Sequence, residues 1–210
     1  MIDPHFYYLP NLGVLKTQLP NKLKNKLLKE CKKAELNNEI LKTGITATGV
    51  PIQFLLKDTK KELQEFIIPL VNLYFEQHPD YLKSVNILNK KTDLFIDKPW
   101  MNLQRKYEYI PNHIHDGILS YNIFLKIPYA EKKLKRNKKE IPFIGSKFNS
   151  FEFSFTNVCG QPQHHSMNIT KKDEGVVFLF PSQLTHCVYP FYDTNKLRIS
   201  ISGNVKFYTK

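Results

Sequence analysis

Two histidines stand two residues apart in the segment Pro111-Asn-His-Ile-His-Asp116. In an extended chain such residues project from the same face, so the imidazoles of His113 and His115 would converge on one point. Converging nitrogen donors are what a transition metal needs. Asp116 follows and would point to the opposite face of a regular strand. The spacing therefore predicts a metal site at this pair of histidines.

A third histidine, His186, follows an apolar segment that ends at Pro181 and then turns. Twelve residues further on, Arg198 and Ser200 would share one face of a strand. A guanidinium beside a hydroxyl suits the carboxylate of a small dicarboxylic acid. A facial set of three protein ligands with open positions suits Fe(II) and O₂ chemistry. Each of these motifs is weak evidence by itself. The order in which they follow one another along the chain is what supports the prediction.

The elements that must position these residues divide into a helical first part and a strand-rich second part. A helical spacing of leucines predicts a helix from Pro20 to about Glu35. A second helix is expected to begin near Thr59, because Thr59 and Glu62 have the spacing of a capping box. Pro69 would interrupt or bend this helix, and His78-Pro79 would end it.

From Thr92 onward, apolar and polar residues alternate as they do in half-buried strands. Many short strands separated by Pro and Gly predict a sandwich or jelly roll. The pair His164-His165 is expected in a solvated turn or hairpin loop, and the charged run 131–140 in a surface loop. The strands are expected at Asp93–Ile96, Trp100–Gln104, Leu119–Ile127, Ser150–Asn157, Gly175–Phe180 and Leu197–Phe207.

The chain has 210 residues, of which 41% are hydrophobic, and this fits one packed domain. We expect a single domain over 1–210, with a helical part at 1–90 and a β core at 91–210. No apolar run is long enough for a membrane span, and the first residues lack the pattern of a signal peptide. A cytoplasmic protein is therefore expected. The three cysteines are widely spaced and form no CxxC pair.

The formal net charge is +12, which makes nucleic acid a possible partner. Only three of the 31 basic residues are arginine, however, and asparagine is abundant. This composition fits a codon bias toward Lys and Asn, so nucleic-acid binding is not favoured as the main function. The scarcity of arginine draws attention to Arg198. Its guanidinium can donate two parallel hydrogen bonds to one carboxylate, which the ammonium of a lysine cannot do.

In sequence, the chain resembles the 2-oxoglutarate/Fe(II)-dependent oxygenases, and among them the small oxygenases of tailed phages. The resemblance covers roughly Trp100 to Val205, about half of the chain. It rests on the following stretches: Trp100–Gln104, Pro111–His115, Leu119–Pro128, Phe151–Phe153, Glu174–Ser182, His186–Phe191 and Arg198–Asn204.

This resemblance implies an α+β, mainly β fold: a double-stranded β-helix (jelly roll) with N-terminal helices packed on it. It implies Fe(II) and 2-oxoglutarate as cofactors, and O₂ and an unknown substrate as partners. His186 would be the distal histidine ligand, and Arg198 and Ser200 would hold the far carboxylate of 2-oxoglutarate. The implied reaction is hydroxylation with decarboxylation of 2-oxoglutarate to succinate. Polar residues on the flanking strands could help to hold cosubstrate or substrate: Asn102, Gln104 and Asn122.

The chain departs from the wider superfamily at one position, because His115 stands where a carboxylate is usual. Three arrangements follow. His113, His115 and His186 form a three-histidine site, Asp116 supplies the carboxylate from an irregular strand end, or His115 is the first ligand with Gly117 in the carboxylate position. The last arrangement is similar to that of halogenating relatives. We favour the first.

Two other function classes remain open at this stage. A cupin-like metal protein would also use the HxH pattern on a jelly roll. In such a protein, however, Arg198 and Ser200 would have no function. A non-catalytic jelly-roll binding module, associated with nucleic acid, would fit the missing carboxylate and the positive charge. Iron bound at stoichiometric level would exclude that module.

Overall fold

The computed structural model describes residues 11–37, 51–85, 93–129 and 147–208, so the charged run 131–140 lies outside the described residues. The helices of this part of the chain are α1 (Asn21–Leu36), α2 (Lys60–Gln77), α3 (Pro79–Ser84) and the 3-10 turn η1 (Lys171–Asp173). Its strands are β1 (Leu15–Gln18), β2 (Ile52–Leu55), β3 (Leu94–Ile96), β4 (Trp100–Gln104), β5 (Ile110–His113), β6 (Leu119–Lys126), β7 (Ser150–Thr156), β8 (Pro162–Asn168), β9 (Val176–Pro181), β10 (Thr185–Val188) and β11 (Arg198–Phe207).

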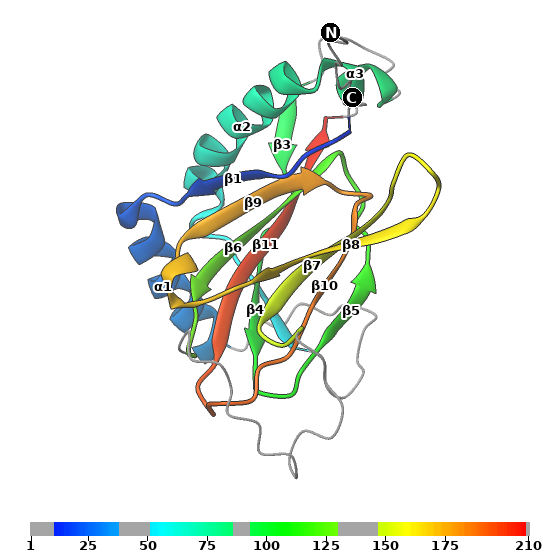
Figure 1. Ribbon diagram of the computed structural model, residues 1–210. Coiled ribbons are helices and arrows are strands. Elements are labelled where there is room, and N and C mark those ends of the chain that lie inside the picture. The colour runs from blue at the N-terminus through cyan, green and yellow to red at the C-terminus, as the bar shows by residue number, and fades with distance from the viewer. Residues whose placement is uncertain (1–10, 38–50, 86–92, 130–146, 209–210) are drawn as a thin grey trace, which may run out of the picture.

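The strands form two antiparallel sheets that face each other (Figure 1). The larger sheet has the order β1-β9-β6-β11-β4-β2, and β3 pairs with the last residues of β11. The smaller sheet has the order β5-β10-β7-β8. Most neighbours in both sheets are distant in sequence, as β6 and β11 are. The expected α+β, mainly β architecture is thus confirmed.

The alternation of side chains along each strand separates two cores. On β6, Tyr121 and Ile123 join the core beneath the helices. The side chain of Phe124 points instead between the sheets, where it meets Phe151 and Phe178 edge-on, at ring-centroid distances of 5.8 and 5.4 Å. The same alternation on β4 and β11 turns their polar residues toward the space between the sheets.

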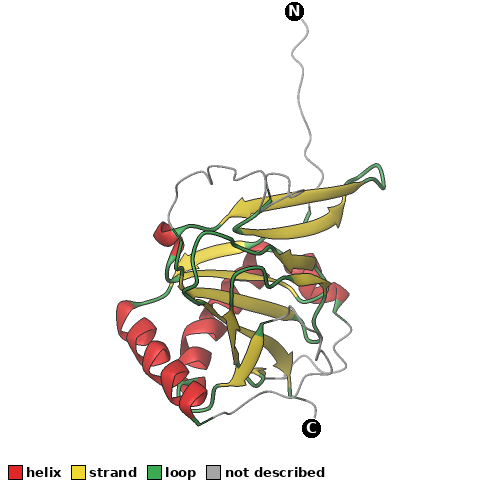
Figure 2. Cartoon of the chain, turned by 90° about the horizontal axis from the view of Figure 1, so that it is seen from below, coloured by secondary structure: helices red, strands yellow, loops and turns green. Residues whose placement is uncertain are grey.

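The helices cover the outer face of the larger sheet, away from the smaller one (Figures 1 and 2). α1 agrees with the predicted helix and buries Leu27 and Cys31. Pro69 lies inside α2 without ending it, and the helix stops at Gln77 as predicted. Pro79 then opens α3, since its missing N–H costs nothing at a first helical position. No helix in the described ranges is long and apolar enough to cross a membrane.

The capping box expected at Thr59 and Glu62 is not formed. The N–H and hydroxyl groups of Thr59 donate instead to the carboxylate of Glu30 on α1, which also accepts from the two preceding backbone N–H groups. Glu62 meanwhile pairs with Lys26 at 2.6 Å. A carboxylate from another helix has therefore replaced the local cap.

The expectation for His164 and His165 was wrong, because both lie in strand β8. The turn lies earlier, between Thr156 and Pro162, and β8 is the edge strand of the smaller sheet. Proline is tolerated at Pro162, because the first residue of an edge strand does not have to donate a backbone hydrogen bond to a neighbouring strand. Both histidines are exposed, as expected. Strands β1 and β2 were not expected either.

Candidate active site

The pairing of β5 with β10 brings His113 and His186 together, because they are direct partners in the antiparallel register. His115 follows the end of β5, and its ring lies beside the other two at centroid distances of 4.9 and 5.0 Å. The candidate ligand atoms of the three rings all lie within 4.8 Å of one another. Within the described residues, no other group of three His, Cys, Asp or Glu side chains is gathered in this way.

Backbone carbonyl groups fix the orientation of two of these rings. The Nδ1–H of His113 donates to the carbonyl oxygen of Pro111 at 2.7 Å, and that of His186 to the carbonyl oxygen of Leu184 at 2.9 Å. Because a carbonyl oxygen only accepts, the proton sits on Nδ1 and the Nε2 lone pair is free. Hydrogen bonds of this kind orient metal-binding histidines and set their tautomer.

Burial keeps the three imidazoles neutral. Phe151 stacks on His186 at a centroid distance of 5.5 Å and an interplanar angle of 16°. Burial, followed by the proximity of His113, lowers the pKa of His186 to about 3 and that of His115 to about 4. Burial also lowers the pKa of His113. At neutral pH all three rings therefore offer a lone pair, which is the form that binds metal.

The carboxylate of Asp116 lies outside this cluster. Its side chain is 75% exposed and accepts hydrogen bonds from Lys206 at 2.6 Å and Asn204 at 3.2 Å. Gly117 has a φ of +102°, and a Cβ there would come within 2.7 Å of the carbonyl oxygen of Val205. This glycine is therefore needed for the close approach of its backbone to β11.

A cavity of about 330 Å³ adjoins the three histidines. Its volume suits a small organic ligand. Trp100, the one tryptophan of the chain, lies in its wall with its ring 5.6 Å from that of His115. Much of the polar part of the wall comes from the inward faces of β4, β6 and β11, and includes Asn102, Asn122, Ser200, Ser202 and Asn204.

Arg198 is 2% exposed and lies beside this cavity, two residues before Ser200 on β11, while Ser200 itself lines the cavity. The guanidinium donates to the side-chain oxygen of Gln104, to the hydroxyl of Tyr129 at 2.9 Å and to the carbonyl oxygen of Tyr189 at 3.0 Å. All three acceptors are neutral, and no carboxylate among the described residues forms an ion pair with it. A buried cation without an anion is costly, so the group is suited to receive an anionic ligand.

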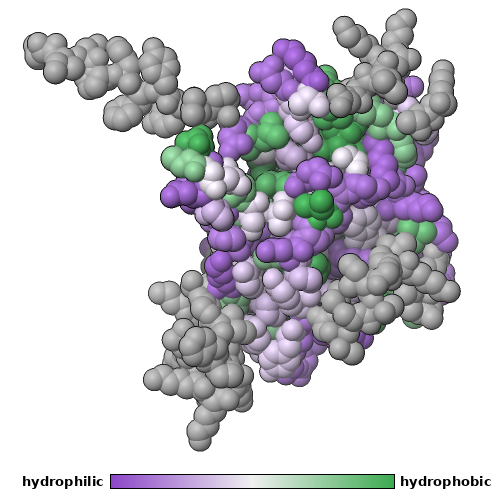
Figure 3. Space-filling view, turned by 90° about the vertical axis from the view of Figure 1, so that its right-hand side faces the viewer, coloured by the Kyte–Doolittle hydropathy of each residue, from purple (hydrophilic) through white to green (hydrophobic). Residues whose placement is uncertain are grey.

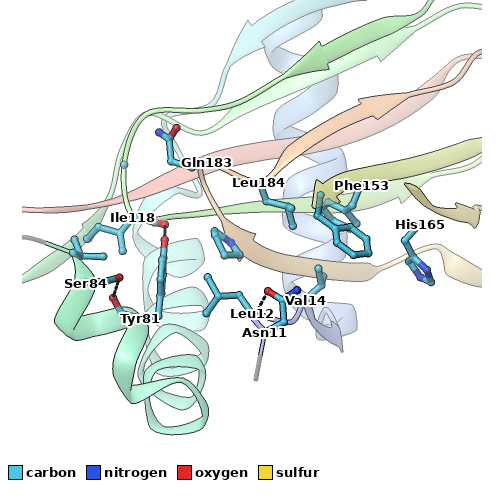
Figure 4. Close-up of a pocket in the computed structure, with 14 residues that line it drawn as sticks. Asn11, Leu12, Val14, Tyr81, Ser84, Ile118, Phe153, His165, Gln183 and Leu184 are labelled. Carbon is cyan, nitrogen blue, oxygen red and sulfur yellow. Dashed lines mark hydrogen bonds between the residues drawn. The ribbon is translucent and has the colours of Figure 1, made fainter. Parts of the chain in front are cut away.

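A second cavity, of about 640 Å³, is lined in part by the turn that precedes His186 (Figure 4). The side chains of Gln183 and Leu184 line it. The same turn supports the cluster through two hydrogen bonds. The side-chain amide of Gln183 donates to the carbonyl oxygen of His115 at 3.1 Å, and the carbonyl oxygen of Leu184 accepts from the ring of His186. On the side of the molecule near β5 and β8, hydrophobic side chains lie in small groups between hydrophilic ones (Figure 3).

The structure brings together the three predicted histidines, and it places Ser200 in the same cavity with Arg198 adjacent to it. Sequence reasoning missed Ser202 and Tyr129. For Ser202 a signal existed, because a residue two positions after Ser200 shares its face of the strand. For Tyr129 there was none, since its contact with Arg198 depends on tertiary packing beyond the end of β6.

Comparison with solved structures tests the expected fold. The chain is similar to a prolyl-4-hydroxylase of Pseudomonas putida, with a TM-score of 0.54 and 14% identity, over 94% of this chain and 93% of that one. It is also similar to SnoK, a non-heme alpha ketoglutarate dependent carbocyclase from nogalamycin biosynthesis, with a TM-score of 0.58 and 8% identity, over 93% of this chain and 79% of that one. These likenesses confirm the double-stranded β-helix fold.

The sequence then defines the family. Residues 98–204 match the family described as "Putative 2OG-Fe(II) oxygenase", which is half of the chain and includes all five predicted site residues. The chain belongs to this family. It is a 2-oxoglutarate/Fe(II)-dependent oxygenase that uses Fe(II) and 2-oxoglutarate as cofactors. No protein of curated function matches it in sequence.

Proposed function

We propose that His113, His115 and His186 hold the Fe(II), and that Arg198 with Ser200 holds the far carboxylate of 2-oxoglutarate. The observation that carries this proposal is the gathering of three neutral imidazoles at a cavity whose neighbouring buried cation has no anion. Neutral imidazole nitrogens suit a divalent first-row metal, and a guanidinium suits a carboxylate. The residues present therefore fit both groups.

The charges of this site favour joint binding of metal and cosubstrate. Three neutral ligands leave both positive charges of Fe(II) uncompensated by the protein. The doubly negative 2-oxoglutarate offsets them, whereas a carboxylate ligand would have offset one of them beforehand. We therefore expect Fe(II) to bind more tightly in the presence of 2-oxoglutarate than alone.

The proposed reaction is hydroxylation of a C–H bond in an unknown substrate. One oxygen atom of O₂ enters the substrate and the other enters succinate, while 2-oxoglutarate loses CO₂. When bound, Fe(II) and 2-oxoglutarate supply the activation of O₂, and the chain supplies orientation and shielding. Phe151, packed on His186, makes that side of the site apolar and keeps water away from it.

An anaerobic titration of metal-free protein with Fe(II) and then 2-oxoglutarate tests this assignment. Fe(II) should quench the fluorescence of Trp100, and 2-oxoglutarate should then produce a visible charge-transfer band. Arg198→Lys should need at least about tenfold more 2-oxoglutarate for the same band, since an ammonium lacks the two-pronged donor. Arg105→Lys, at an exposed arginine, should behave as the wild type. Absence of both bound iron and the band would instead support a non-catalytic jelly-roll module.

We also propose, from the sequence pattern alone, that the chain is of the tailed-phage type, which would place it in the cytoplasm of a host cell. The genes that flank its coding sequence provide the test. Neighbouring tail or capsid genes would support the proposal, and a setting among bacterial metabolic genes would contradict it.

A further inference from the structure

Polar side chains on the cavity wall form a hydrogen-bond relay that runs in one direction. The Nε2–H of Gln53 on β2 donates to Oδ1 of Asn102 at 2.8 Å. The Nδ2–H of Asn102 donates to Oγ of Ser202 at 3.2 Å and to Oγ of Ser200 at 3.4 Å. The hydroxyl of Ser202 then donates to Oδ1 of Asn122 at 3.1 Å. The relay crosses four strands of the larger sheet, from β2 to β6.

The direction of the relay fixes the orientation of the Asn122 amide. Ser202 accepts a hydrogen bond from Asn102, so its own proton needs an acceptor, and Oδ1 of Asn122 is that acceptor. In the opposite orientation, Ser202 would face two donors, and its hydroxyl proton would lose its acceptor. The Nδ2 group of Asn122 is therefore the end that the relay leaves free.

This nitrogen is buried and has no hydrogen-bond partner among the described residues. Asn122 is 6% exposed and lines the cavity beside the three histidines. A buried N–H without an acceptor is costly, and native proteins keep few of them. Because Asn122 lines the cavity, a ligand bound there is the nearest source of an acceptor for this buried amide.

The position of Asn122 indicates which part of the ligand it meets. The inward-facing residues of β11 follow one another in steps of two from Arg198 to Asn204. Asn122 on β6 is the partner of Ser202 in the strand register. Ser202 lies two such steps from Arg198 and one step from Asn204. Asn204 touches Asp116, the neighbour of His115. Asn122 therefore lies nearer to the histidine end of the cavity than to the guanidinium.

We propose that the Nδ2–H of Asn122 donates to an oxygen of the 2-oxo acid end of 2-oxoglutarate and fixes that end beside the histidines. This inference rests on the proposed function of the site. It makes Asn122 a cosubstrate-binding residue, with Ser202 as the residue that positions it. It also gives the cavity a means to select ligands that carry an acceptor oxygen at this point.

Binding of 2-oxoglutarate to the full chain loaded with redox-inert Zn(II) tests the inference without turnover. Asn122→Asp replaces the free donor by a charged oxygen of the same shape, so the dissociation constant should rise by more than about tenfold, as measured by calorimetry. Pyruvate, which has the 2-oxo acid end alone, should lose affinity in the same variant. Asn195→Asp introduces the same charge on an exposed loop and should change neither value by more than about twofold.

Nuclear magnetic resonance of asparagine side-chain amides provides a readout that a purely structural role would not change. The Asn122 amide signal, identified by its absence in Asn122→Asp, should move downfield when wild-type protein is saturated with 2-oxoglutarate. Ser202→Ala, which frees the amide to turn, should weaken binding by about two- to tenfold. Ser202→Thr, which restores the hydroxyl, should recover most of that loss.

The outcomes separate this inference from the assignment on which it rests. If wild-type protein binds neither Zn(II) nor 2-oxoglutarate, the proposed function fails. If wild-type protein binds both, but Asn122→Asp binds 2-oxoglutarate within about twofold of it, the inference alone fails. Should Asn122→Asp not fold, the wild-type amide signal and the two Ser202 variants decide: an unmoved signal or an unchanged Ser202→Ala affinity overturns the inference.

Discussion

At the scale of single residues, the choice between His115 and Asp116 decides what kind of metal site this is. His115 contributes to the cluster, whereas the carboxylate of Asp116 is engaged by Lys206 and Asn204. We predict that His115→Ala weakens Fe(II) binding by more than about tenfold, and that Asp116→Ala changes it by less than about threefold. Equilibrium dialysis under anaerobic conditions measures both. The reverse pattern would make Asp116 the third ligand.

The buried histidines also make the stability of the metal-free protein depend on pH. Burial, together with the proximity of His113, lowers the pKa of His186 to about 3, against a usual value of 6.5. Between these values the unfolded chain binds more protons than the folded one, so stability falls as the pH falls. The loss begins near pH 6.5 and continues down to about pH 3. Above pH 6.5 both states are neutral and this contribution is constant.

We therefore predict that the melting temperature of EDTA-treated protein decreases steadily from pH 7 to pH 4. His186→Phe keeps an aromatic ring against Phe151 but cannot be protonated, so its melting temperature should depend less on pH. His165→Gln, at an exposed histidine of β8, should keep the wild-type slope. An unchanged slope in His186→Phe would show that other groups cause the acid sensitivity. Differential scanning calorimetry at several pH values makes the comparison.

At the scale of elements, the carboxylate of Glu30 joins α1 to the start of α2. Glu30 is 6% exposed and accepts hydrogen bonds from backbone N–H groups at 57–59, at distances of 2.6 to 2.9 Å. Glu30→Ala should lower the free energy of unfolding by about 2–4 kcal/mol, because it removes the acceptor of four hydrogen bonds at once, including both donors of the buried Thr59. Glu35→Ala, at an exposed position of the same helix, should change it by less than about 0.5 kcal/mol. Urea denaturation provides both values, and equal losses would contradict this role.

The elements show where sequence patterns suffice and where they do not. The alternation in Leu119–Ile127 and Leu197–Phe207 predicted β6 and β11, since each strand has one face toward the helices and one toward the other sheet. β1 and β2 have four residues each and lie in the part of the chain, 1–90, that was expected to be helical. The Thr59 cap failed because a better acceptor arrives from a distant helix, which no local spacing reveals.

The same limit applies to the site. The sequence order identified His113, His115, His186, Arg198 and Ser200, because each lies in a recognisable motif. The relay from Gln53 to Asn122 was not predicted as a unit, since its members come from different strands and meet only through the register of the sheet. Motifs thus mark residues that act through their own spacing, whereas supporting residues emerge from the fold.

At the scale of the whole molecule, the proposed ligands would connect the two sheets. The histidines belong to the smaller sheet and the segment beside it, whereas Arg198, Ser200 and Asn122 belong to the larger one. Metal and 2-oxoglutarate bound together would therefore span the space between the sheets. A ligand that binds only the folded state stabilises it by mass action, by about 2.7 kcal/mol at one hundred times its dissociation constant.

For a chain of this length, that stabilisation corresponds to a rise of roughly 5–10 °C in melting temperature. We predict such a rise when Zn(II) and 2-oxoglutarate are added together, and a smaller one with Zn(II) alone, because the dianion offsets the charge of the metal. 2-Oxoglutarate alone should have little effect. In His186→Ala the combined rise should disappear, since the metal loses a ligand and the cosubstrate loses the metal. Scanning fluorimetry provides the comparison, and an equal rise in His186→Ala would mean that the two ligands bind elsewhere on the molecule.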